Sequence, residues 1–199
     1  MNLTKTGWLA LLLALVILSV IVIDRYRDLS VAIPADLKPE LPSQPYEGWR
    51  EYESRIGGFS AKFPGLPQNA KNTITERRSN QVLVYDMYIA EQWDGTVYMV
   101  TVVTYPFEIQ QKEEVLSNFL SDVLTSNPQN ELVLAVKEQF RGQEALKFKV
   151  KTNQAYIDAL AFIRKDKLYY LSEISANLEE EGKDFQYFID SFQLLENKS

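Results

Sequence analysis

The pattern of apolar and polar residues beyond residue 48 is mostly that of strands. In the segment FSAKF, residues 59–63, every second position is apolar, which is the period of a strand with one buried face. The segment Lys71–Arg78 is polar throughout, so we expect it to be exposed or at the edge of a sheet. The predicted strands are Trp49–Arg55, Phe59–Phe63, Lys71–Arg78, Val82–Gln92, Thr96–Tyr105, Glu131–Phe140, Glu144–Thr152, Gln154–Arg164 and Leu168–Ser175.

Short turn sequences connect these strands. Trp93-Asp94-Gly95 contains an Asp-Gly pair, which is a strong signal for a tight hairpin. Two more hairpins are predicted at Arg141-Gly142-Gln143 and Lys165-Asp166-Lys167. Because connections this short cannot cross over a sheet, the strands that they join run antiparallel.

The stretch GGFSAKFPGLPQ, residues 57–68, carries an unusual density of glycine and proline. Gly57-Gly58 predicts a turn before the strand. Pro64 ends the strand because it lacks an N–H for the ladder, Gly65 permits a positive φ, and Pro67 keeps the departing chain extended. These constraints predict a structural role for the stretch rather than a chemical one.

Two segments have the apolar spacing of helices. Lys112–Thr125 places its apolar residues on one face and ends before an Asn-Pro pair. Asn177–Phe192 begins with Asn177 as the candidate N-cap, and Glu179–Glu181 follow in the first turn, where acidic side chains favour the positive end of the helix dipole. The order of strands and helices predicts an α+β domain in which helices pack on an antiparallel sheet.

The amino-terminal segment has a different pattern. Residues Trp8–Ile23 carry no charge and are apolar on all sides. As a helix they span about 24 Å, which is short but sufficient for a bilayer with Trp8 and Tyr26 at its interfaces. Because no small-residue cleavage site comes after them, we expect an uncleaved anchor in residues 1–27 rather than a removed signal peptide.

The residues on either side of the anchor bear on its orientation and on its link to the domain. Lys5 precedes the span and two arginines come after it, so the count of basic residues does not decide the orientation. The layout of a signal anchor favours a domain outside the cytoplasm, and the cytoplasmic orientation stays open. Four prolines make residues 28–48 an extended linker, for which a proline-rich partner ligand is the alternative. Residues 49–199 then form one domain.

Composition excludes several kinds of chemistry. The 199 residues include no histidine and no cysteine, which removes imidazole and thiolate metal ligands as well as Ser-His-Asp and Cys-His catalysis. The net charge of −6 argues against general nucleic-acid binding. The acids Glu179–Glu181 resemble calcium ligands in type, but their spacing matches no calcium loop. The sequence thus predicts no enzyme activity, no cofactor and no metal.

Two motifs add a family resemblance. FSAKFPGLP at residues 59–67, followed by a central helix and hairpins, and FQYFIDSFQL at residues 185–194 resemble the PsbP-like α/β/α sandwich family. The resemblance covers about residues 49–195. That family includes the extrinsic oxygen-evolving subunit of photosystem II, a Ran-binding nuclear-import factor and small bacterial envelope proteins. The resemblance implies a sheet between helices and a role in binding or assembly. The lipoprotein members carry a lipidated cysteine, which this chain replaces with the predicted membrane helix.

Five residues are candidates for contact with a partner. Trp93, beside a predicted hairpin tip, and Trp49, just past the linker, are aromatic residues that we expect to be exposed. Lys147, Lys149 and Lys151 alternate with apolar residues. They form either a basic stripe for an anionic partner or the solvent face of a half-buried strand.

Two functions fit these observations. The first is a membrane-anchored, non-enzymatic module that binds a protein partner and helps to assemble a membrane or envelope complex. The alternative is an extracytoplasmic sensory domain that holds a small molecule or lipid in a cleft between sheet and helices. Aromatic residues such as Tyr85, Tyr105 and Phe107 either line such a cleft or pack within the sheet. A hydrolase is disfavoured because no sequence feature marks a catalytic carboxylate pair.

Overall fold

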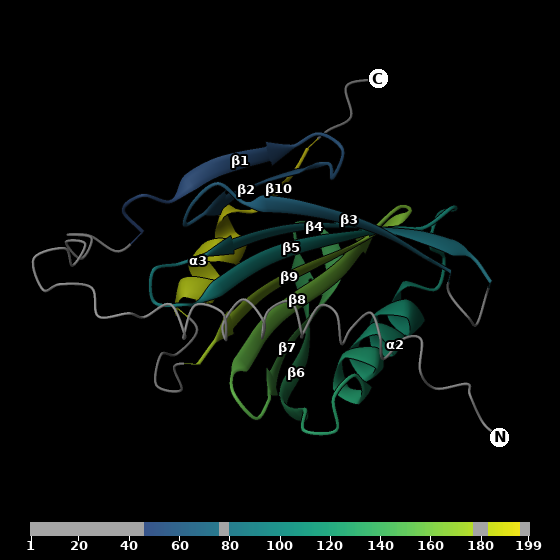
Figure 1. The fold of residues 1–199 in the computed structure, drawn as a ribbon. Helices are drawn as coiled ribbons and strands as arrows, with labels where there is room; N and C mark the ends of the chain where they lie inside the picture. The colour runs from purple at the N-terminus through teal and green to yellow at the C-terminus, as the bar shows by residue number, and fades with distance from the viewer. Residues whose placement is uncertain (1–45, 76–79, 177–182, 196–199) are drawn as a thin grey trace, which may run out of the picture.

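The computed structural model describes residues 46–75, 80–176 and 183–195, which form two antiparallel sheets and two helices (Figure 1). The larger sheet has the strand order β3-β4-β5-β9-β8-β7-β6, and the smaller sheet has the order β1-β2-β10. The elements are β1 (Arg50–Ser54), β2 (Phe59–Phe63), β3 (Gln68–Thr75), β4 (Val82–Glu91), β5 (Val97–Thr104), α2 (Lys112–Thr125), β6 (Glu131–Phe140), β7 (Gln143–Lys151), β8 (Tyr156–Arg164), β9 (Lys167–Ser175), α3 (Lys183–Ser191) and β10 (Gln193–Leu194).

Different layers cover the two faces of the larger sheet. Helix α2 packs on one face, where Leu83, Phe148 and Ile163 are buried. Helix α3 and the smaller sheet pack on the other, around fully buried Phe63 and Phe188 (Figure 1). The predicted α+β arrangement is confirmed, but the α/β/α sandwich is right only in part. The layer opposite α2 is shared by a helix and a sheet, because the apolar face of β2 also needs a core to cover.

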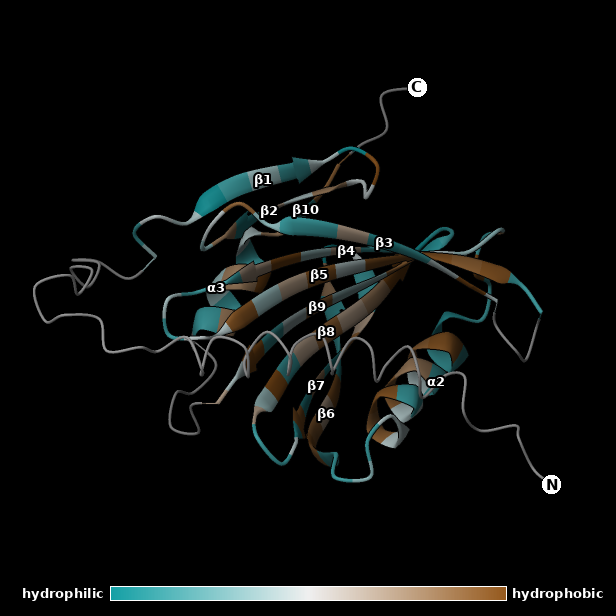
Figure 2. Ribbon diagram, viewed as in Figure 1, coloured by the Kyte–Doolittle hydropathy of each residue, from teal (hydrophilic) through white to brown (hydrophobic). Residues whose placement is uncertain are grey.

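The central strands of the larger sheet are apolar on both faces, whereas the outermost strand of the smaller sheet is polar (Figure 2). Seven of the eight residues of β5 are buried, as expected for a strand covered on both sides. Strand β1 lies on the outside and exposes most of its residues. The hydropathy pattern therefore matches the layers, with the greatest burial midway between the two helices.

Strand β3 lies at one edge of the larger sheet, which confirms the prediction of a polar edge strand. It starts at Gln68 rather than Lys71 because the chain is already extended after Pro67. The β6–β7 hairpin also differs slightly from expectation. Arg141 and Gly142 both have positive φ, as a two-residue type I′ turn requires, so β7 starts at Gln143.

The GGFSAKFPGLPQ stretch forms the predicted turn and strand, but its three glycines differ in their roles. Gly58 has a φ of +75°, a conformation that side chains disfavour. Gly57 lies so close to Phe59 that a Cβ there would sit 2.8 Å from the ring. Gly65 does not adopt the positive φ that we expected, and a Cβ there would meet nothing within 4 Å.

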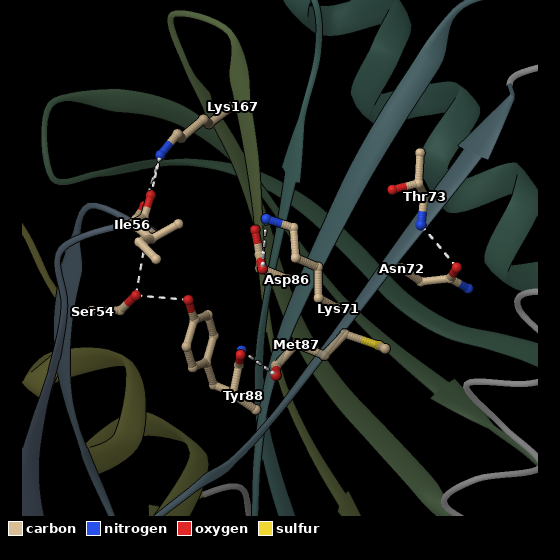
Figure 3. A network of polar contacts seen from close by, with 11 residues as sticks. Ser54, Ile56, Lys71, Asn72, Thr73, Asp86, Met87, Tyr88 and Lys167 are labelled. Atoms are coloured by element: carbon tan, nitrogen blue, oxygen red, sulfur yellow. Dashed lines mark hydrogen bonds and ion pairs between the residues drawn. The ribbon is translucent and has the colours of Figure 1, made fainter.

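Polar contacts join the smaller sheet to the larger one at this turn (Figure 3). The hydroxyls of Ser54 and Tyr88 form a buried hydrogen bond of 2.7 Å, and the Ser54 Oγ accepts the N–H of Gly57 at 2.9 Å. The Lys167 Nζ donates to the carbonyl of Ile56 at 2.7 Å. The turn is therefore held by both β4 and β9, which fixes the smaller sheet over its core.

Several predictions concern residues outside the described ranges. The predicted anchor, residues 1–27, lies there, and within the described ranges no helix is long and apolar enough to cross a bilayer. The candidate N-cap Asn177 and the acids Glu179–Glu181 also lie outside them. In the described part of that segment, α3 runs over Lys183–Ser191 and ends one residue before the predicted end at Phe192, and the short strand β10 follows at Gln193–Leu194.

Candidate functional site

Trp93 occupies the turn between β4 and β5 with 65% of its surface exposed. The turn is fixed by backbone bonds from Gln92 N to Thr96 O and from Gly95 N to Gln92 O, at 2.8 and 3.0 Å. The Asp94 carboxylate accepts the N–H of Thr96 at 2.9 Å, which completes the loop. The exposure expected from the sequence is therefore right, and a role for Trp93 as a contact residue stays a prediction.

Trp49 is packed against other aromatic rings rather than projecting freely. Its ring makes edge contacts with Tyr98 at 4.7 Å and Tyr187 at 5.3 Å. Tyr46 stacks on Tyr187 at 3.7 Å and donates a hydrogen bond to the Asp184 carboxylate at 2.8 Å. Desolvation by burial, with this hydrogen bond, raises the pKa of Tyr46 to about 12. The geometry gives Trp49 a clear structural role, which attaches residues 46–49 to α3.

The lysines of β7 point to the face that carries α3, while their apolar neighbours are buried under α2. Lys147 donates to the Gln186 side chain of α3 at 3.1 Å. Lys149 forms an ion pair with Asp158 at 3.0 Å, with both side chains half-buried. Lys151 is exposed. The three lysines are therefore not equivalent, because two of them have partners within the domain.

Strand β6 is the other edge of the larger sheet, and its character is opposite to that of β3. Leu132, Val133, Leu134 and Val136 are all between 44% and 54% exposed. The strand pairs on one side with β7 and has a bulge between Leu132 and Leu134. An exposed apolar edge strand offers unpaired backbone groups together with apolar contacts, which is the arrangement that accepts an added strand. This β6 edge is the first candidate binding site.

A cleft of about 570 Å³ lies between α2 and the larger sheet. We call it the α2 cleft. Its buried part is lined by Val103 and Leu168 of the sheet and by Ile109, all at most 4% exposed. Phe119 of α2 and Phe107 of the connecting loop add aromatic walls. The volume suits a small organic molecule, since ligand pockets usually measure about 300–1,000 Å³.

The loop from Tyr105 to Gln111 forms one wall of the α2 cleft and is held by the neighbouring hairpin. Tyr105 N donates to the carbonyl of Asp166 at 2.8 Å, and Ile109 N donates to the carbonyl of Lys165 at 3.0 Å. Lys165 has a positive φ of 57°, which turns the hairpin tightly enough to bring its carbonyls to the loop. These bonds fix both ends of the aromatic segment, so the cleft wall is preformed.

The rim of the α2 cleft is acidic. Glu108, Glu114 and Asp122 line it together with neutral amides, and the described lining contains neither lysine nor arginine. Glu113, in the same helical turn as Glu114, is paired with Lys137 of β6, whose hydrogen bond lowers the pKa of the Glu113 carboxyl. The cleft thus combines apolar walls with a negative rim.

Comparisons with known proteins find solved structures of similar fold. No protein-family model matches the sequence, and no curated protein sequence matches it. The fold is similar to the solution structure of the cyanobacterial PsbP protein of Synechocystis sp. PCC 6803, with a TM-score of 0.44, 16% identity, and coverage of 80% of this chain and 99% of that one. It is also similar to a protein from Bacteroides thetaiotaomicron, with a TM-score of 0.41, 10% identity, and coverage of 75% of this chain and 49% of that one. Scores this low carry no inference, and membership of the PsbP-like family stays a prediction.

Sequence reasoning found part of the lining of the α2 cleft and did not find the β6 edge. The apolar run of β6 was predicted as a strand, but its position at an edge depends on which strand pairs with which. Tyr105 and Phe107 were noted as aromatic, and the structure places both at the α2 cleft. Their clustering in the short segment between a strand and a helix was the one signal available. No group of three or more potential metal ligands occurs among the residues that the structure describes.

Proposed function

We propose that this protein is a membrane-anchored, non-enzymatic module that binds a partner protein and helps to assemble or stabilise a complex at the membrane. The observation that supports this function most is the apolar β6 edge. Natural edge strands are usually protected by charge, as β3 is by its polar sequence. Strand β6 instead exposes the apolar side chains of Leu132, Val133, Leu134 and Val136.

The occupant that fits the β6 edge is an extended strand of the partner protein. Its backbone would pair with the free side of β6, and apolar side chains at its centre would contact Leu134 and Val136. Glu131 pairs with Lys151 of β7, and Glu138 pairs with Ala145. Both glutamates therefore lie on the same face of the sheet as Leu134 and Val136, and they flank these two residues along β6. The partner strand would therefore carry basic residues near its ends, where they face these carboxylates.

Site-specific crosslinking of the full chain in its native membrane tests the proposal. A photoreactive residue at Val133 should crosslink to one partner after gentle solubilisation, and the double substitution Leu134→Lys and Val136→Lys should abolish that crosslink. The matched control is Leu66→Lys, at an apolar residue that is 83% exposed on a different surface. Recovery of the protein without a partner, an adduct with a second copy of the same chain, or capture unaffected by the β6 substitutions would refute the proposal.

The anchor and its orientation form part of the same proposal. The apolar segment Trp8–Ile23 supports a single-pass anchor with the domain outside the cytoplasm. The full chain should stay in the membrane pellet after alkaline carbonate washing. A topology reporter fused after Ser199 should be active only outside the cytoplasm, and cytoplasmic activity would reverse the orientation without removing the anchor.

Binding of a small molecule is the second candidate function, and the α2 cleft favours it. The cleft has a suitable volume, a preformed wall and mixed apolar and polar lining. A tryptophan at Val115, on the α2 side of the cleft, fills the space without changing charge. Ligand binding to the full chain should be lost in Val115→Trp while its melting temperature stays near that of the wild type. Binding that persists in the filled variant would exclude the α2 cleft as the site.

A further inference from the structure

A second hollow lies on the other side of α2 from the α2 cleft, between the helix and the β6–β7 hairpin. We call it the α2–β6 pocket, and its volume is about 270 Å³. Its floor includes Leu116 of α2 and Leu146 of β7, which are 6% and 9% exposed. Lys137, Glu138 and Gln139 of the edge strand β6 form its outer side. The volume is below the usual range for a small-molecule ligand and suits a single side chain.

The α2–β6 pocket lies beside the position that a partner strand would take on β6. Gln139 pairs with Glu144 of β7. Lys137 pairs with Leu146, which is buried under α2. Because paired residues share one face of a sheet, a partner residue opposite Gln139 would also project toward α2. Neighbouring strands are about 4.8 Å apart, so that side chain has to extend past β6 to enter the pocket, and only a long side chain can do so.

The lining favours a long side chain that is apolar along its stem and cationic at its end. The floor is apolar, whereas Glu144 at the rim is exposed and Glu113 of α2 is paired with Lys137. Among the described residues, four carboxylates and two lysines line this pocket and the hollow beside it. The start of α2 adds only about half a positive charge, so the local charge stays negative. A lysine or arginine can pack its stem on the floor and place its charged end beside Glu144.

We propose that the α2–β6 pocket holds a lysine or arginine side chain of the partner strand, from the residue that pairs opposite Gln139. This inference rests on the proposed addition of a strand to β6 and specifies one residue of the partner. The neighbouring residue of the partner strand faces the other side of the sheet, where Glu138 lies. Because a basic residue is already proposed to face Glu138, the partner strand carries two adjacent basic residues at this end.

Crosslinking of the full chain from inside the pocket, in its native membrane, tests this assignment. Ser117 is exposed and lines the pocket on the α2 side, so a small diazirine residue there should capture the same partner as the probe at Val133. The partner residue joined to it should be at or next to a lysine or arginine. Asn118 is the matched control, because it is the next residue of α2 and lines the α2 cleft instead. A diazirine at Asn118 should not capture that partner.

Charge reversal at Glu144 tests the chemical class of the bound side chain. Glu144→Lys should reduce the crosslink from Val133 about tenfold or more, because a charge-assisted hydrogen bond is replaced by repulsion. The matched control is Glu51→Lys on β1, which changes net charge equally and should leave the crosslink unchanged. Capture from Val133 without capture from Ser117, or a Glu144→Lys variant that crosslinks like the wild type, would overturn the pocket assignment alone. Absence of capture from both probes would remove the proposed function as well.

Discussion

Replacing Gly57 by alanine tests how closely the first turn approaches the core. The added Cβ would lie 2.8 Å from Cδ1 and Cε1 of Phe59 and 2.9 Å from the Ser54 Oγ, where ordinary contacts are 3.4–4 Å. Phe59 is fully buried, so its ring has no free space into which to move. Ser54 is also constrained, because its hydroxyl is bonded to Tyr88.

The expected cost is set by these contacts. Forcing a methyl group into a packed core costs about 1–3 kcal/mol. Displacing the Ser54 hydroxyl weakens its hydrogen bonds with Gly57 and Tyr88, at a net cost of about 1 kcal/mol. The sum is about 3 kcal/mol. For a domain of this size that corresponds to a fall in melting temperature of about 6–12 °C.

Thermal unfolding of the full chain in mild detergent, followed by circular dichroism, measures this change. Gly65→Ala is the matched control, because its Cβ would meet nothing within 4 Å and its φ is not positive. We expect the control to melt at or slightly above the wild-type temperature, since alanine restricts the unfolded chain. Equal melting of Gly57→Ala and wild type, or equal destabilisation by both substitutions, would refute the reasoning.

Three further predictions concern the core and its buried polar groups. Burial raises the pKa of Tyr169 and of Tyr170 to about 12, so the unfolded chain loses these protons near pH 10 while the folded chain keeps them. The free energy of unfolding should therefore fall between about pH 10 and 12, by up to about 1.4 kcal/mol per pH unit for each tyrosine. Urea titrations at several pH values measure this slope. If Tyr169→Phe does not reduce the slope, Tyr169 is not one of the groups responsible. Phe188→Ala should cost about 3–5 kcal/mol in chemical unfolding, because the ring is fully buried between the sheets, and a loss below about 1 kcal/mol would be inconsistent with that core. Asp158→Asn should cost about 1 kcal/mol by leaving half-buried Lys149 without its ion pair, and the difference from wild type should shrink in high salt.

Local pattern was sufficient for every described element except the short strand β10, and it was insufficient for their arrangement. Period-two alternation identified the strands, and turn residues identified their antiparallel hairpins, because both signals act between neighbours in sequence. The pairing of β5 with β9 joins residues far apart in the chain, and no local signal specifies it. The third strand of the smaller sheet is β10, in which Gln193 and Leu194 pair with β2. A strand of two residues has no period to detect.

The candidate sites depend on the same long-range arrangement. The sequence identified Trp93 as exposed because a hairpin tip has few neighbours, but Trp49 looked similar and is packed by Tyr46 and Tyr187. The β7 lysines could be assigned to one face by alternation. Tertiary packing alone places α3 over part of this face, where Lys147 contacts Gln186.

The stacking of Tyr46 on Tyr187 has a consequence for the space that the domain can explore. It fixes the point at which the preceding chain joins the folded body, beside α3. If residues 8–23 cross a bilayer, residues 24–45 connect the membrane span to the folded domain. A fully stretched chain advances about 3.4 Å per residue, which limits the distance between the span and the domain to about 75 Å. The domain would then stay within a thin layer next to its own membrane, and it would contact only those molecules that enter that layer.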